Sequence, residues 1–128
     1  MSDQTPKHGH FCWNELVTND TKAAGDFYTK LLGWSANKQD MGDFTYTIFK
    51  AGDNEVGGMM AIGKDWGDVP PHWMAYVVVD DVDVSTRKAE ELGAKVCMPT
   101  TDIPKVGRFS VITDPTGATI SLFKSAKQ

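Results

Sequence analysis

The chain repeats one pattern of helix and strand signals after about 60 residues, and this repeat restricts the folds open to it. A segment with apolar residues at helical spacing ends at Gly33, and a second such segment ends at Gly93. Asp20 is a good N-cap for the first helix, and Asp80 or Asp81 is its counterpart in the second. A repeat of this length in a chain of 128 residues predicts two modules packed about a pseudo-twofold axis.

Each repeat has the predicted element order β-α-β-β-β. The helices are expected at Asp20–Leu32 and at about Val84–Leu92, outside the sheets. Strands are expected over residues 10–20, 35–40, 44–52, 55–63, 72–81, 95–100, 107–113 and 118–124, with a tight turn at 114–117. The predicted class is α+β, with a disordered tail at 1–7 and one domain at 8–125. This domain divides into module one (8–63), a connector (64–71) and module two (72–125).

The composition narrows the possible partners. Thirteen Lys and Arg against seventeen Asp and Glu give a net charge of −4, which gives no reason to expect nucleic acid or an anionic membrane. Apolar runs such as MAYVVV are too short to span a bilayer, and MSDQTPK has no apolar signal core. We therefore expect a cytoplasmic protein in which Cys12 and Cys97 are reduced thiols.

Three motifs in order resemble the vicinal oxygen chelate superfamily, which includes glyoxalase I, bleomycin-resistance proteins and extradiol dioxygenases. They are D-x-x-x-A-x-x-F-Y-x-x-L-L-G-W from Asp20, V-x-V-D-D-V-D from Val77 and D-P-x-G-A from Asp114. The segments FCWNELVT, VGGMM, PPHWMAY and VGRF are similar to a bacterial glyoxalase-like subgroup, some of whose members carry two such domains in tandem. The resemblance implies one domain whose two modules form an incomplete barrel-like cavity for a small ligand.

The resemblance also indicates where a metal would be held. Metal-dependent members place ligands on the first and fourth strands of each module, and these positions fall on Trp13, Met59 or Met60, Met74 and Ser121. Hard divalent cations prefer oxygen or imidazole donors, which this set lacks apart from one serine hydroxyl. We therefore predict no metal and no cofactor in the cavity. A separate, adventitious metal site remains open at the three histidines, His8, His10 and His72.

Glu15 is a carboxylate on a strand face that it shares with Phe11, Trp13 and Val17. A buried charge needs a partner or a shifted pKa. Glu15 therefore pairs with a basic group such as Arg108, points outward at the sheet edge, or serves in the pocket wall as a base or hydrogen-bond acceptor.

The residues expected to line the ligand site combine apolar surface with a few polar anchors. They are Trp13, Glu15, Met60, Met74, Tyr76, Arg108, Phe109 and Ser121. Gly57 and Gly58 allow close backbone approach, or they mark a bulge in a curved strand.

The favoured function is metal-independent binding of a small aromatic or hydrophobic molecule, for sequestration or carriage as in bleomycin-resistance proteins. The alternative is a metal-free isomerase, epimerase or hydroxylase-like accessory enzyme that uses Glu15 and Tyr76; a glyoxalase-type lyase fits less well because it needs the metal. An interaction domain without a ligand is a third reading. We also expect a homodimer, with Trp34, Trp66 and Trp73 as exposed contact candidates.

Overall fold

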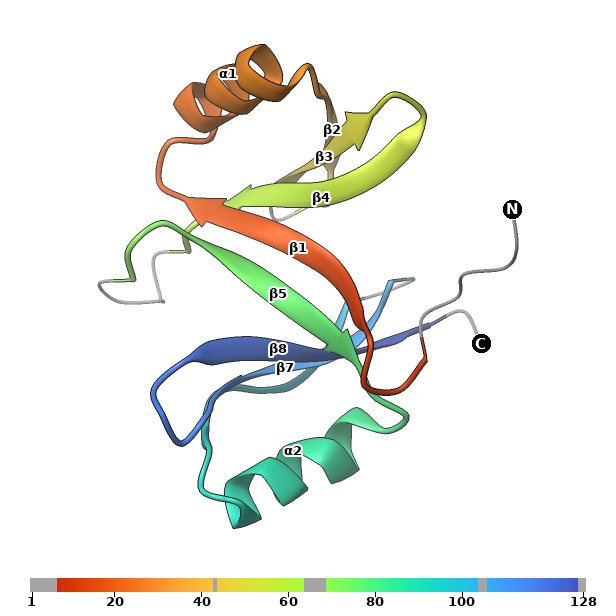
Figure 1. The fold of residues 1–128 in the computed structure, drawn as a ribbon, viewed down its shortest axis with the longest axis vertical. Coiled ribbons are helices and arrows are strands. Elements are labelled where there is room, and N and C mark those ends of the chain that lie inside the picture. The colour runs from red at the N-terminus through yellow and green to blue at the C-terminus, as the bar shows by residue number, and fades with distance from the viewer. Residues whose placement is uncertain (1–6, 43, 64–68, 104–105, 127–128) are drawn as a thin grey trace. The chain divides into compact units, whose positions relative to one another are not determined.

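The computed structural model describes residues 7–42, 44–63, 69–103 and 106–126. Within these ranges the order of elements is β-α-β-β-β followed by β-α-β-β-β, as the repeat predicts (Figure 1). Contacts divide the chain into two compact units, Trp13–Met74 and Met1–Cys12 with Ala75–Gln128. Most of the expected tail (1–6) and connector (64–68) lies outside the described residues.

The first unit contains a mixed sheet with strand order β2-β3-β4-β1. Its strands are β1 (Phe11–Thr18), β2 (Ser35–Asp40), β3 (Thr45–Ala51) and β4 (Asn54–Ala61). β1 runs parallel to β4, whereas β3 is antiparallel to β2 and β4. The weak strand signal at residues 35–40 is therefore confirmed, as a fully exposed polar strand at the sheet edge.

Helix α1 (Thr21–Leu32) covers one face of this sheet (Figure 1). The Asp20 carboxylate accepts a hydrogen bond from the Ala23 amide at 3.0 Å, which begins the helix. Gly33 ends it in the left-handed conformation, with φ of 73°. The core beneath the helix consists of Leu16, Phe49 and Met59, against which Ala24, Tyr28, Trp34 and Val56 pack.

The second unit contains β5 (His72–Val78), β6 (Lys95–Ile103), β7 (Gly107–Thr113) and β8 (Thr119–Ser125) in the order β5-β8-β7-β6. Its helix α2 spans Val82–Glu91. The expected start at Val84 is wrong by two residues, because Asp81 is the N-cap and accepts from the Val84 amide at 3.1 Å. The hydroxyls of Thr86 on α2 and Ser110 on β7 lie 2.8 Å apart in the buried contact between helix and sheet.

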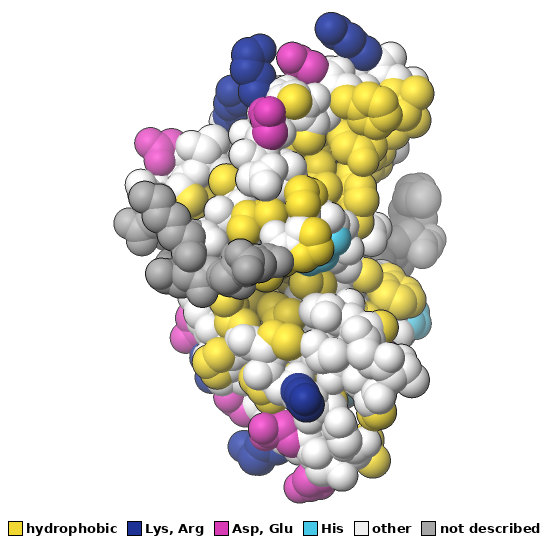
Figure 2. Space-filling view, turned by 90° about the vertical axis from the view of Figure 1, so that its left-hand side faces the viewer, with side chains coloured by type: hydrophobic (Ala, Val, Ile, Leu, Met, Phe, Trp, Pro, Cys, Tyr) yellow, Lys and Arg dark blue, Asp and Glu magenta, His cyan; other side chains and the backbone are white. Residues whose placement is uncertain are grey.

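Apolar side chains at the surface of the first unit gather near α1 (Figure 2). Phe27, Leu31 and Leu32 are each at least half exposed. Trp73 is also exposed, but the expectation that Trp34 is exposed is wrong, because it packs on the core and stacks on Tyr28. Trp66 lies outside the described residues. The homodimer stays a prediction.

Neither helix in the described part of the chain has the length and apolar character needed to cross a bilayer.

Phe49 and Phe27 provide a matched test of the first core, because Phe49 has no exposed surface whereas Phe27 is 56% exposed. We expect Phe49→Ala to lower the free energy of unfolding by about 3–5 kcal/mol, since it opens a cavity under α1. Phe27→Ala should change it by less than about 0.5 kcal/mol. Urea unfolding of both variants measures the difference, and equal losses would contradict this description of the core.

Candidate functional site

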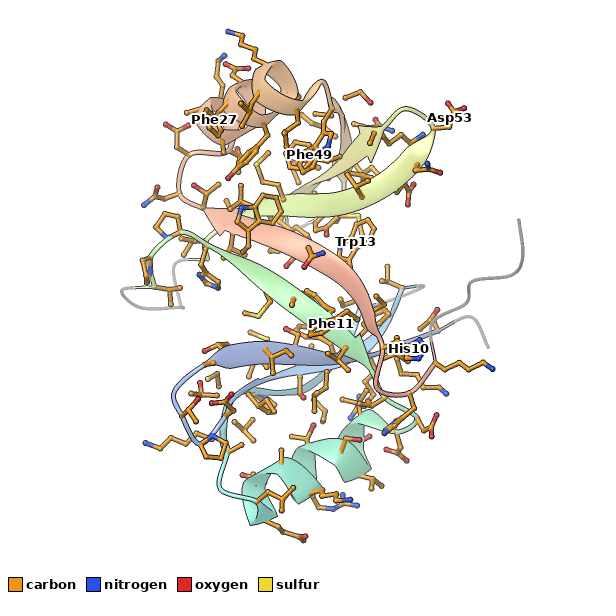
Figure 3. The ribbon with its side chains drawn as sticks, viewed as in Figure 1. His10, Phe11, Trp13, Phe27, Phe49 and Asp53 are labelled. Carbon is orange, nitrogen blue, oxygen red and sulfur yellow. The ribbon has the colours of Figure 1, made fainter. Side chains whose placement is uncertain are left out.

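Side chains of β1 alternate between the two faces of the first sheet. Leu16 points into the core under α1, so Trp13 and Glu15 point to the opposite face. Figure 3 shows Phe49 between the sheet and α1, with Trp13 on the other side. Strand register places further residues beside Glu15, with Gly58 directly opposite on β4. We call this surface the Glu15 face; it comprises Trp13, Glu15, Val17, Tyr46, Ile48, Gly58 and Met60.

A chain of hydrogen bonds crosses the Glu15 face. The Trp13 indole N–H donates to the Tyr46 hydroxyl at 2.9 Å, and that hydroxyl donates to Glu15 Oε1 at 2.8 Å. Glu15 is 8% exposed, whereas Trp13 and Tyr46 are half-buried. The carboxylate is therefore largely removed from water and stabilised by a hydroxyl donor from β3.

Gly58 makes room for this arrangement. A Cβ atom at position 58 would overlap the Tyr46 hydroxyl and ring, reaching 2.7 Å from Cε2. Any other residue would therefore push Tyr46 away from Glu15 unless the strands shifted. The glycine pair was expected to permit close approach or to mark a bulge. The register shift of this strand pair lies beside it: Phe49 pairs with Gly57 and Lys50 with Glu55, so Val56 of β4 is the extra residue. At Gly58, close approach is the reason.

Tyr46 keeps its proton in this setting. Burial raises the pKa of Tyr46 most, and the negative charge of Glu15 raises it further, while the hydrogen bond from Trp13 acts in the opposite direction. The phenol therefore remains a donor to the carboxylate well above neutral pH. Sequence reasoning missed Tyr46. It could have been found from its position, because Tyr46 lies two residues before Ile48 and so shares a strand face with it, on a strand that pairs with the VGG segment.

Three of the expected ligand residues share a face in the second unit. Register pairs Tyr76 with Ser121, and Phe109 with Phe123, two residues further along β8. The Tyr76 and Phe123 rings meet edge to face with centroids 6.1 Å apart. The Ser121 hydroxyl is fully buried and has no hydrogen-bond partner among the described residues.

Arg108 does not share that face, because it is adjacent to Phe109 on β7 and side chains alternate. It lies on the α2 side, where its guanidinium donates to both carboxylate oxygens of Asp83, at 3.0 and 2.8 Å, and also to Asp102 and Thr100. These bonds lower the pKa of Asp83. The guanidinium thus joins α2 to the sheet, and its expected role in ligand binding stays a prediction.

The residues at the superfamily's metal positions do not fit a divalent cation. The Trp13 indole N–H has no lone pair to offer and is bonded to Tyr46. Met74 is a buried thioether, and Met60 is another thioether. Ser121 adds one neutral hydroxyl, which is a weak ligand by itself.

The rings of His8 and His72 each contact the backbone. His8 Nδ1 accepts from the Asp80 amide at 3.0 Å, and His72 Nδ1 lies 2.8 Å from the Pro70 carbonyl. Across the described ranges, no three His, Cys, Asp or Glu residues come together as a group that could hold a metal.

The overlap between position 58 and Tyr46 predicts a specific coupling. Gly58→Ala should destabilise the protein by about 1–3 kcal/mol, because the added methyl collides with the phenol. In a Tyr46→Ala background the same change should cost much less, since the obstructing ring is gone. A double-mutant cycle by urea unfolding measures this coupling, and an equal cost in both backgrounds would show that Tyr46 is not the reason for the glycine.

The raised pKa of Tyr46 predicts a loss of stability in alkali. Below pH of about 10, folded and unfolded states both hold the phenol proton; above it, only the unfolded state releases it, which favours unfolding. The wild-type protein should therefore lose about 1 kcal/mol more than Tyr46→Phe between pH 9 and 11 in urea titrations. Other tyrosines and the lysines are common to both proteins, so parallel losses would contradict the assignment.

Residues 7–122 match the family described as the Glyoxalase/Bleomycin resistance protein/Dioxygenase superfamily. A Mycobacterium tuberculosis protein named "Putative glyoxylase CFP32" is 40% identical over 121 residues, which are 94% of this chain and 46% of that protein. "Anthracycline biosynthesis protein DnrV" of Streptomyces peucetius is 31% identical over 125 residues, covering 88% of this chain and 46% of that protein. The chain thus spans about half the length of these relatives.

Among solved structures, methylmalonyl-CoA epimerase from Mycobacterium tuberculosis is similar with a TM-score of 0.65. The match covers 98% of this chain and 93% of that one, at 18% identity, so it concerns the fold alone. The family match over most of the chain and the paired β-α-β-β-β units agree with the resemblance seen in the sequence motifs. This chain belongs to the glyoxalase/bleomycin resistance protein/dioxygenase superfamily.

Proposed function

We propose that this domain binds a small aromatic or hydrophobic molecule without a metal, at the Glu15 face. The observation that supports this most is the pair of hydrogen bonds from Trp13 to Tyr46 and from Tyr46 to Glu15, which joins two aromatic rings to a buried carboxylate. Aromatic surface stacks on flat ligands, and one fixed polar group orients them. Met60 adds a thioether that adapts to ligand shape.

Two further observations support a metal-free, aromatic-binding role. The residues at the superfamily's metal positions lack suitable donors, so binding by shape and hydrogen bonds remains. The name of one relative refers to anthracyclines, which are polycyclic aromatic compounds. We propose aromatic compounds as the ligand class for this chain, and we carry over no activity from that relative.

A second candidate is metal-free proton transfer by an isomerase or epimerase. The observation in its favour is Glu15, a buried carboxylate that accepts a hydrogen bond from a protonated phenol and could take a carbon-bound proton. Tyr46 joins the expected residues Glu15 and Tyr76 in this proposal, because its hydroxyl donates to Glu15. Incubating the bound molecule with protein in D2O distinguishes the candidates, because an enzyme of this kind introduces deuterium at carbon and a carrier does not.

The ligand itself can be identified by capture. Pure protein is incubated with cell extract, recovered, and analysed by mass spectrometry for small molecules that co-purify. We expect the retained molecule to be aromatic or hydrophobic, and to be lost from Trp13→Ala, which removes the indole surface. Recovery of the same molecule by Trp13→Ala at wild-type yield would place binding elsewhere in the chain.

Once a ligand is in hand, Glu15→Gln tests the carboxylate. Folding should change by less than about 1 kcal/mol, because the amide oxygen still accepts from Tyr46. Affinity should fall about tenfold or more, since the charge-assisted bond to the ligand is lost. Glu55→Gln is the matched control, because Glu55 is exposed on β4 and carries the same charge. A large loss of stability with unchanged affinity would assign Glu15 to structure.

A further inference from the structure

The hydrogen bonds on the Glu15 face have only one possible direction. An indole N–H is a donor with no acceptor capacity, so the Tyr46 oxygen must accept from Trp13. The phenol has a single hydrogen, and Glu15 Oε1 lies 2.8 Å away to receive it. Trp13 therefore donates to Tyr46, and Tyr46 donates to the Glu15 carboxylate, which is the final acceptor.

In this arrangement the Trp13 and Tyr46 donors are both used within the protein, so the Glu15 face offers a ligand mainly hydrogen-bond acceptors. Trp13 and Tyr46 each have one polar side-chain hydrogen, and each donates it in one of these two hydrogen bonds. Tyr46 retains that hydrogen because burial and the charge of Glu15 raise the pKa of its phenol. A carboxylate has about four lone-pair positions, so it can accept from a ligand in addition to the contacts it makes within the protein.

The residues nearest Glu15 on this face carry no positive charge. Val17, Ile48, Gly58 and Met60 have no charged side chain. Lys50 lies two residues beyond Ile48 on β3, where the register places it opposite the carboxylate residue Glu55. The register places Asn37 and Gln39 of β2 in line with Ile48 and Tyr46, but amides both donate and accept and so do not favour either sign. Aromatic ring faces also attract cations.

We infer that the ligand of the Glu15 face is an aromatic cation or hydrogen-bond donor, such as an aryl-alkyl ammonium group, and not an aromatic carboxylate. This inference rests on the proposed function and specifies its ligand class. An anion would meet the Glu15 carboxylate with no donor on Trp13 or Tyr46 left to receive it. An ammonium group would instead form a charge-assisted hydrogen bond to that carboxylate.

Three matched probes test the inference: 2-phenylethylammonium, 2-phenylethanol and 3-phenylpropionate. Each is titrated into the full chain while the NMR signal of the Trp13 indole N–H is followed, with Trp13→Phe identifying that signal. We expect the ammonium probe to bind about tenfold or more tightly than the carboxylate, with the neutral alcohol between them. Glu15→Gln should reduce this ratio to near one.

Glu55→Gln is the control for general attraction of cations by an acidic chain, because it changes the net charge by the same amount at an exposed site. It should leave the ammonium preference intact. Equal reductions in both variants would attribute the preference to net charge and overturn the inference. Tighter binding of phenylpropionate would overturn the inference alone, since an aromatic molecule would still bind at Trp13. If no probe moves the indole signal at millimolar concentration, the proposed function fails and the inference fails with it.

Discussion

Burial of the Glu15 carboxylate is the most demanding requirement of the first unit. A buried carboxylate is unstable without a donor, and the Tyr46 hydroxyl from β3 donates to this one. Tyr46 on β3 reaches Glu15 on β1 across β4, so β4 must have no side chain at position 58. The contact also requires the β3–β4 register that places Ile48 opposite Gly58. The glycine, the tyrosine and the strand register therefore depend on one another, and Trp13 completes the set by donating to the phenol.

The two units have the same order of strands and helix, but different side chains on the two faces of their sheets. In the first, the sheet meets its helix through apolar groups centred on Phe49, and the other face holds the hydrogen-bonded carboxylate. In the second, a Thr86–Ser110 hydroxyl pair lies under the helix. Its opposite face pairs Tyr76 with Ser121 at the positions where the first unit pairs Glu15 with Gly58. The repeat thus maintains the backbone plan, while the chemistry of the sheet face opposite each helix has diverged.

Sequence reasoning predicted the element order and the family because those depend on local signals: caps at Asp20 and Gly33, alternation in strands, and the DPTG turn. It also placed Trp13 and Glu15 on one strand face, since they are two residues apart on one strand. It could not predict Tyr46 as the donor, because that contact joins residues 31 apart and depends on the register of two strand pairs. For the same reason it associated Arg108 with Glu15, whereas the guanidinium binds Asp83, 25 residues away on α2. Local patterns specify faces; they do not specify which side chains meet across strands.

The alternation along β1 also limits how this domain can evolve. Inserting or deleting one residue between Trp13 and Leu16 would exchange the two faces, bringing the carboxylate under the helix and the leucine out of the core. Such a change would damage folding and binding together, so this strand can vary in residue identity but not in length. The β3–β4 pair tolerates one extra residue, Val56 of β4, because this register shift lies beyond Ile48 and Gly58, towards the turn that joins the two strands. Natural length variation in this domain should therefore be found in the turns and at strand ends.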